Sequence, residues 1–108
     1  MSFSVFLTTA AARDLDDIYD YIQSHDVPGK ADELLNNLEQ IVNSLSEFPR
    51  RGTYPKELLP LGIREYREIY HHAYRIIYRI MDNKVYIMLI ADGRRDMQNL
   101  LQRRILQD

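Results

Sequence analysis

The alternation of apolar and polar residues in the second half of the chain most constrains its fold. Residues 73–81 and 84–91 are rich in aromatic and β-branched residues, and the pair Asp82-Asn83 separates them. Asp and Asn tolerate the positive φ of a type I′ turn, so this pair predicts a two-residue β-hairpin. The predicted pairs are Ile80–Val85, Tyr78–Ile87 and Ile76–Leu89 on one face, and Arg79–Tyr86, Ile77–Met88 and Arg75–Ile90 on the other.

A third strand is predicted over residues 63–70, with a turn at His71-His72. This turn pairs Glu68 with Arg75, Tyr66 with Ile77, and Arg64 with Arg79. The side-chain period of a strand is two, so a slip of one residue would exchange the two faces.

Two amphipathic helices precede these strands. Residues 3–7 predict a strand, after which Thr8 or Thr9 can cap a helix through its hydroxyl. Pro28 and Gly29 then break the chain, so the two helices form an αα-hairpin. The apolar stripes at helical spacing are Ala11, Leu15, Ile18 and Ile22 in the first helix, and Ala31, Leu34, Leu35, Leu38, Ile41, Val42 and Leu45 in the second.

These segments make one domain, residues 1–108, of the α+β class. We expect an N-terminal strand and a two-helix hairpin packed on a three- to four-stranded antiparallel sheet, with a C-terminal helix. Residues 49–62 form a connection of unusual length with three prolines and two glycines. Residues 84–91 need cover on both faces, which the C-terminal helix can supply through Met97, Leu100, Leu101 and Ile105.

The arginines of the strands predict a binding surface. Arg64, Arg75 and Arg79 fall on one side of the sheet with Tyr66, and Arg94 and Arg95 follow the last strand. Such a surface suits an amphipathic helix, an acidic partner or phosphates. The alternative is that the C-terminal helix covers the apolar part, while the arginines form ion pairs with Glu65, Glu68 or Asp96.

Other chemistry is sparse. The net charge of −2 argues against a general nucleic-acid binder, although residues 1–60 are acidic overall and residues 61–108 are basic. The four aspartates at 14, 16, 17 and 20 read as a solvated helix face rather than a metal site. No cysteine, hydrolytic triad or phosphate-binding glycine loop occurs, and no apolar run reaches the roughly 18 residues of a membrane span. We therefore expect no metal, no cofactor, no membrane contact and a cytoplasmic location.

The order of elements resembles the RelE/ParE superfamily of bacterial toxins. The phrases that carry the resemblance are "AARDLDDIYDYI" near the N-terminus and "IREYREIYHHAYRIIYRIMDNKVYIMLIADGRRD". The second is similar to the ParE pattern of an Arg-containing strand, a polar turn, an apolar strand and a closing Gly-Arg-Arg-Asp box. Asp92 stands where a His usually precedes that box.

The resemblance implies a toxin of a type II toxin–antitoxin pair, neutralised by a small cognate antitoxin in a possible hetero-oligomer. RelE-like members cleave mRNA in the ribosome, whereas ParE-like members poison DNA gyrase. Arg75 and Arg95 match two basic positions of the RelE-like set. Its two strand lysines fall on Tyr66 and Glu68, and its helix tyrosine falls on Leu101. None of these three can supply the same charge or proton transfer, which favours the ParE-like branch.

Three functions therefore remain open: a gyrase poison without an active site, a ribosome-dependent mRNA endonuclease that uses arginines alone, and an inactive relative that only binds. The candidate target-binding residues are Arg64, Tyr66, Arg75, Arg79, Arg94 and Arg95, and no catalytic residue is predicted.

Overall fold

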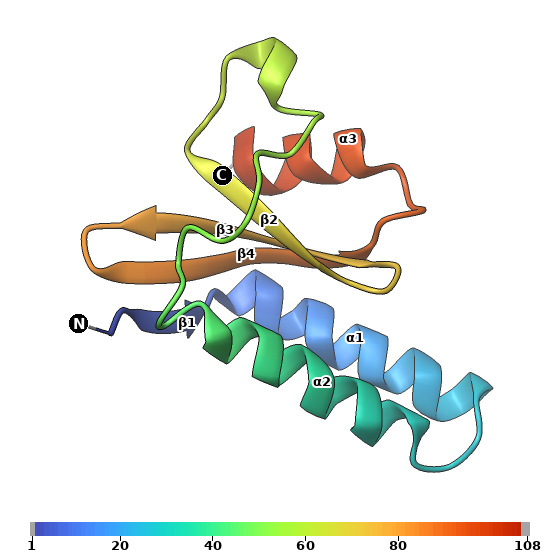
Figure 1. Ribbon diagram of the computed structural model, residues 1–108. Coiled ribbons are helices and arrows are strands. Elements are labelled where there is room, and N and C mark those ends of the chain that lie inside the picture. Colours follow the sequence, from blue (N-terminus) through green and yellow to red (C-terminus); the bar gives the residue numbers. More distant parts are fainter. Residues whose placement is uncertain (1, 107–108) are drawn as a thin grey trace.

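Two helices cover one face of a four-stranded sheet, and a short third helix lies on the other face (Figure 1). The computed structural model describes residues 2–106. None of the helices in this range is long and apolar enough to cross a membrane. The elements are β1 (Ser4–Leu7), α1 (Thr9–His25), α2 (Lys30–Ser44), the 3₁₀ turn η1 (Leu59–Leu61), β2 (Tyr66–His71), β3 (Tyr74–Met81), β4 (Lys84–Asp92) and α3 (Met97–Leu101), which the π-helical segment Gln102–Leu106 continues.

The sheet has the strand order β1-β4-β3-β2. Strands β2, β3 and β4 form the predicted antiparallel meander, whereas β1 pairs with β4 in parallel. The α+β class, the helix hairpin and the C-terminal helix are thus confirmed, in a sheet that is mixed rather than wholly antiparallel.

The β3–β4 hairpin keeps the predicted register only near its turn. Ile80–Val85, Tyr78–Ile87 and Arg79–Tyr86 pair as predicted, but the register shifts between Ile77 and Tyr78. Met88 is the additional residue of β4 there, so its successors exchange faces, as a β-bulge requires. The predicted pairs Ile76–Leu89, Ile77–Met88 and Arg75–Ile90 are therefore wrong; the structure has Ile76–Ile90, Ile77–Leu89 and Arg75–Ala91.

The β2–β3 hairpin turns one residue later than predicted, at His72-Ala73. His72 takes a φ of 52°, and Asp82 takes 57° in the other hairpin, while the second residue of neither turn has a positive φ. The predicted type I′ turn, with two positive φ values, is therefore wrong. The predicted pairs Glu68–Arg75, Tyr66–Ile77 and Arg64–Arg79 are also wrong; the structure has Tyr70–Arg75, Glu68–Ile77 and Tyr66–Arg79. Each partner changes by two residues, so every side chain stays on its predicted face.

Each face of the sheet has its own core. On the face of α1 and α2, buried strand residues such as Ile76, Tyr78 and Ile87 pack with Leu38 and Leu45. On the opposite face, α3 contributes buried residues, and the core there consists of Leu58, Tyr66, Ile77, Leu89, Ala91, Met97 and Leu101. Both faces of β4 are covered, as its uninterrupted apolar sequence requires.

A threonine cap and a glycine in the left-handed conformation begin the two long helices. Thr8 caps α1, because its hydroxyl accepts from the Ala11 N–H at 3.2 Å and donates to the Ile87 carbonyl at 2.8 Å. Gly29 precedes α2 with a φ of 91°, a left-handed conformation that glycine adopts without strain.

The long connection from α2 to β2 runs along the edge of β2. Its Thr53 forms two backbone hydrogen bonds with Glu68, of 2.7 and 3.1 Å. The buried Tyr78 hydroxyl donates to the Pro49 carbonyl at 2.7 Å and accepts from the Gly52 N–H at 3.0 Å. A Cβ on Gly52 would lie 2.6 Å from that hydroxyl, so only glycine fits there. The connection is therefore a packed part of the domain.

Candidate functional site

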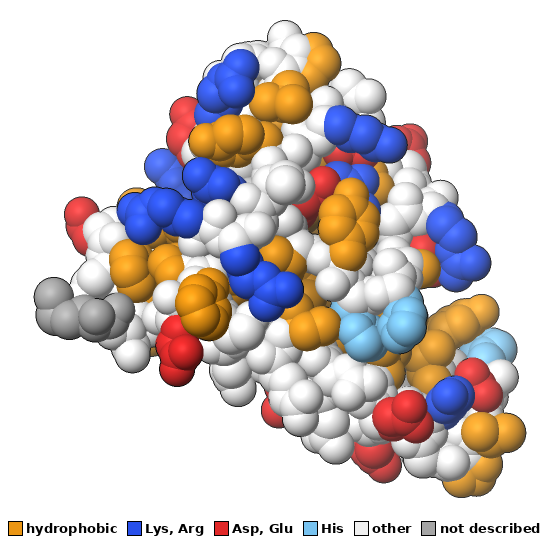
Figure 2. Space-filling view, in the orientation of Figure 1, with side chains coloured by type: hydrophobic (Ala, Val, Ile, Leu, Met, Phe, Trp, Pro, Cys, Tyr) orange, Lys and Arg blue, Asp and Glu red, His pale blue; other side chains and the backbone are white. Residues whose placement is uncertain are grey.

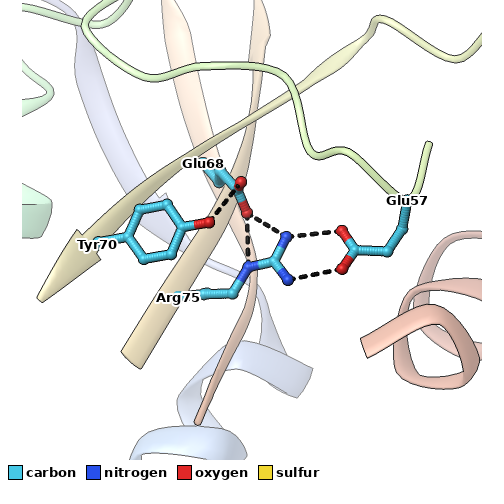
Figure 3. A network of polar contacts seen from close by, with 4 residues as sticks. All are labelled: Glu57, Glu68, Tyr70 and Arg75. Carbon is cyan, nitrogen blue, oxygen red and sulfur yellow. Dashed lines mark hydrogen bonds and ion pairs between the residues drawn. The ribbon is translucent and has the colours of Figure 1, made fainter. Parts of the chain in front are cut away.

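The α3 face of the sheet holds a buried ion-pair network near the β2–β3 turn (Figure 3). Arg75 of β3 is 4% exposed and donates to the Glu68 carboxylate from Nε at 2.7 Å. Its two terminal nitrogens donate to both oxygens of Glu57, each at 2.8 Å. The Tyr70 hydroxyl donates to the second oxygen of Glu68 at 3.0 Å. One guanidinium therefore meets two carboxylates, and none of its charge is directed to solvent.

The pKa values of the network show which charges it stabilises. The hydrogen bond from Arg75 holds the pKa of Glu57 below its ordinary value. The hydrogen bonds with Glu57 and Glu68 raise the pKa of Arg75, so its charge is permanent. Burial, and then the hydrogen bond to Glu68, raise the pKa of Tyr70. Arg75 thus binds the long connection to the sheet, and Glu57, which sequence reasoning missed, is its second partner.

A ladder of aromatic and basic side chains crosses the sheet near the β3–β4 turn. Phe6, Tyr86, Arg79 and Tyr66 are consecutive cross-strand partners in β1, β4, β3 and β2. The rings of Phe6 and Tyr86 stack with centroids 5.6 Å apart, and the Arg79 guanidinium lies 5.6 Å from the centroid of the Tyr66 ring. Such contacts order an arginine without neutralising it.

A basic hollow begins where this ladder reaches β2. It measures about 470 Å³, and its lining residues are Arg50, Arg64, Glu65, Arg67, Arg79, Ile80 and Asp82. We call this feature the basic hollow. Figure 2 shows Lys and Arg side chains gathered around the start of β2. Sequence reasoning named Arg64 and Arg79 but missed the other two arginines. Arg50 was missed because it lies in the long connection, and Arg67 because its side chain alternates to the other face of the sheet.

Arg94 and Arg95 lie at the opposite end of β4. Arg94 is 82% exposed and forms an ion pair with Asp92, with a nitrogen–oxygen distance of 2.6 Å. The hydrogen bonds from Arg94 lower the pKa of Asp92 to about 2. Both arginines border a hollow of about 380 Å³ between α1 and the end of β4, with Ile18 and Ile90 among its apolar residues. We call this feature the α1–β4 hollow.

The structure therefore does not bring the six predicted residues onto one surface. Arg64 and Arg79 line the basic hollow, with Tyr66 buried beneath Arg79. Arg94 and Arg95 border the α1–β4 hollow, and Arg75 is buried on the α3 face, where β3 begins. The alternative stated from sequence holds for Arg75: α3 covers the apolar part of the face, and Glu68 forms an ion pair with this arginine.

A second ion pair closes the open edge of β4. Asp14 of α1 accepts from Arg104 at 2.7 and 3.0 Å and from the backbone N–H of Ile90 at 3.0 Å. Arg104 also donates to the Met88 carbonyl at 2.8 Å. These bonds satisfy backbone groups of β4 beyond the end of β1, next to the bulge. The prediction that all four early aspartates form a solvated face is therefore wrong for Asp14. Among the described residues, no group of three or more His, Asp or Glu side chains is arranged to hold a metal ion.

The positions that the resemblance assigns to RNA cleavage are closed. Glu68 is 5% exposed and paired with Arg75, and Leu101 of α3 is 1% exposed in the second core. Tyr66 is also buried. Arg95 is exposed in the turn after β4, whereas Arg75 is buried and paired with Glu57 and Glu68. In the described part of the chain, Arg75 is therefore paired with carboxylates, and position 101 offers no polar side-chain atom.

Comparison with known proteins identifies relatives along most of the chain. The family described as the ParE toxin of the type II toxin–antitoxin system parDE matches residues 5–97. Toxin ParE3 of Caulobacter vibrioides is 29% identical over 93 residues, which cover 86% of this chain and 89% of the relative.

Solved structures share the fold. A chain of the chromosomal ParDE toxin–antitoxin system of P. aeruginosa superposes with a TM-score of 0.69 at 22% identity, over 84% of this chain and 96% of the other. A chain of the RelBE2 toxin–antitoxin complex of Mycobacterium tuberculosis gives 0.61 at 23% identity, over 85% and 92%. A mutant of the E. coli toxin RelE in the free state gives 0.62 at 12% identity, over 99% and 97%.

Proposed function

Because this chain belongs to the ParE toxin family of type II toxin–antitoxin systems, we propose that it inhibits bacterial growth by poisoning DNA gyrase and that a cognate antitoxin neutralises it. The observation that carries the choice of target is the burial of Arg75 between Glu57 and Glu68. This network occupies the part of the sheet where the resemblance implies RNA cleavage in RelE-like toxins.

An mRNA endonuclease needs cations that reach the scissile phosphate and a group that transfers a proton. Arg75 has its charge-bearing nitrogens on two carboxylates, and Leu101 offers no polar atom. Glu68 adds negative charge where RNA phosphate would have to approach. These features favour a toxin that acts by binding, without an active site of its own.

The exposed end of β4 is the surface that we propose for gyrase. Arg94 and Arg95 project there with little cover, and α3 follows directly. Exposed arginines are common anchors of protein interfaces because their planar guanidinium groups make several hydrogen bonds. Gyrase acts on cytoplasmic DNA, so this proposal places the protein in the cytoplasm.

The α1–β4 hollow suits the antitoxin. Its partly buried Ile18 and exposed Tyr21 receive the apolar side of an amphipathic segment, while Arg94 and Arg95 attract its acidic residues. The solved relatives from P. aeruginosa and M. tuberculosis are described as toxin–antitoxin systems. We propose that this protein likewise forms a hetero-oligomer with its antitoxin, which masks the gyrase surface.

Expression without antitoxin tests the proposal. The wild-type chain should stop growth, induce the DNA-damage response and cause filamentation. The double variant Arg94→Ala/Arg95→Ala should relieve toxicity with little loss of stability, because exposed arginines contribute little to folding. The control Arg13→Ala/Lys30→Ala removes the same charge from exposed positions of α1 and α2 and should remain toxic.

A paired measurement with purified components identifies the target. We expect inhibition of plasmid supercoiling by gyrase, with accumulation of cleaved DNA, and an intact message in a translation extract. Cuts in the mRNA with unaffected gyrase would assign the protein to the ribosome-dependent endonucleases instead. Growth that continues normally with soluble, folded protein would assign it to the inactive relatives.

A further inference from the structure

We propose that the basic hollow binds the sugar–phosphate backbone of duplex DNA. The extension that this contact holds the DNA of the gyrase cleavage complex rests on the proposed function, whereas the DNA contact itself does not. The residues that carry the contact are Arg50, Arg64, Arg67 and Arg79.

The positive charge of the hollow is not cancelled within the protein. Four arginines face two acidic residues, Glu65 and Asp82, among the lining residues. In the described part of the chain neither acid forms an ion pair with any of the four. Arg75, Arg94 and Arg104, in contrast, all have carboxylate partners. A local excess of cations on a chain of net charge −2 indicates a surface that meets an anionic partner.

Aromatic and backbone groups hold the guanidinium groups in place. Arg64 and Arg67 lie 5.8 and 4.8 Å from the centroid of the Tyr54 ring. Arg67 also donates to the Gly52 carbonyl at 2.8 Å. Arg79 lies over Tyr66 in the same way. Side chains that are ordered before binding lose less conformational entropy when they bind a ligand, so these arginines are prepared for repeated phosphate contacts.

The residues that line the basic hollow suit a phosphate backbone better than an acidic peptide. An amphipathic acidic helix needs apolar pockets for its anchor side chains. Ile80 is the one apolar residue among the lining residues of the basic hollow, whereas the α1–β4 hollow offers the partly buried Ile18 and Tyr21, which is 62% exposed. A ligand with closely spaced charges and no need for an apolar pocket fits the basic hollow better. Phosphates of duplex DNA have this character, since they are evenly spaced along each strand.

Fluorescence anisotropy of the purified full-length chain tests the proposal without gyrase. The probes are a labelled DNA duplex of about 20 base pairs and a labelled poly-glutamate of similar charge, each titrated across a salt series. We expect the duplex to bind at low salt at least about tenfold more tightly than poly-glutamate. In the variant Arg64→Gln/Arg79→Gln the affinity for DNA should fall about tenfold or more, and the slope of log K against log salt should decrease by about 2.

Two further variants separate charge loss from misfolding. Arg64→Lys/Arg79→Lys should retain most of the affinity, since lysine still contacts phosphate as a point charge. Arg13→Gln/Lys30→Gln removes the same charge from α1 and α2 and should bind DNA within about twofold of wild type. Circular dichroism should show the same fold for all of them.

Equal losses in the hollow variant and the charge-matched control would overturn the proposal. So would the absence of duplex binding at low salt, or poly-glutamate binding as tight as that of DNA, which would indicate an acidic protein partner. DNA binding without gyrase poisoning would refute the proposed function and leave this inference intact. Gyrase poisoning without DNA binding would do the reverse.

Discussion

Removal of the buried cation at Arg75 should strongly destabilise the α3 face of the sheet. In Arg75→Met the apolar stem is largely kept, but four hydrogen bonds to Glu57 and Glu68 are lost. Glu68 keeps only the Tyr70 hydroxyl and remains buried, and Glu57 faces it without an intervening charge. Loss of one partner of a buried ion pair costs about 3–5 kcal/mol of unfolding free energy.

The size of this loss in unfolding free energy depends on which of the two carboxylates can still reach water. Glu57 lies on the connection with a side chain that is 12% exposed and can turn toward water, whereas Glu68 is held within β2. Urea unfolding followed by circular dichroism at pH 7 should therefore show a loss of at least about 3 kcal/mol. For a domain of this size the melting temperature should fall by roughly 4 °C or more for each kcal/mol.

The pH dependence of stability gives a second readout, because it has opposite signs in the wild type and in Arg75→Met. In the wild type, Arg75 lowers the pKa of Glu57, so this contribution to stability is complete above the ordinary value of 4.5 and is lost as the pH falls through the folded pKa. In Arg75→Met, burial without a cation favours the neutral carboxyl. The variant should therefore become more stable as the pH falls from about 7 to 5.

Arg79→Met is the matched control. Arg79 is only half-buried and contacts the Tyr66 ring rather than a carboxylate, so its loss should cost about 1 kcal/mol or less. Equal losses for the two variants, or an Arg75→Met variant whose stability falls with decreasing pH as in the wild type, would refute the role assigned to the network.

Two other contacts lead to simple predictions. Tyr78→Phe leaves the Gly52 N–H without its partner and should lower the unfolding free energy by about 1–3 kcal/mol in urea titrations, with faster amide exchange at Gly52. Asp14→Ala should cost about 1–3 kcal/mol and speed exchange of the Ile90 amide, whereas Asp16→Ala, at an exposed position, should stay within about 0.5 kcal/mol of wild type.

Local periodicity explains which parts of the fold could be predicted from the sequence. The helical stripes define α1 and α2, and the Asp82-Asn83 turn fixes the pairing of β3 with β4 as far as Tyr78. Beyond that point β4 is apolar at every position, so its sequence carries no signal of which side chain faces which core. The contacts beside the bulge, Ile90 with Asp14 and Met88 with Arg104, join positions that are 76 and 16 residues apart and could not be read locally.

The ion-pair partners of the arginines were harder to predict than the face of the sheet on which each arginine lies. Alternation placed Arg75 and Arg79 on the same face, and Glu68 was among the glutamates considered as ion-pair partners. Glu57 lies 18 residues before Arg75 in a connection without periodicity, so nothing in the sequence indicated their contact. This long-range ion pair is why Arg75 does not share a surface with the other predicted arginines.

The network also limits how the function of this chain could change. A lysine at position 68, which the resemblance implies for RNA cleavage, would place a second buried cation beside Arg75 and leave Glu57 alone to balance both charges. Repulsion in a site with little water is large, so Glu68→Lys should disrupt the sheet before it creates a phosphate-binding site. Glu57 and Glu68 would have to change together with Arg75 before this part of the sheet became accessible to a ligand. Single substitutions that alter binding are therefore better tolerated at the basic hollow and at the end of β4, where the arginines are exposed or half-buried and the fold depends less on their charge.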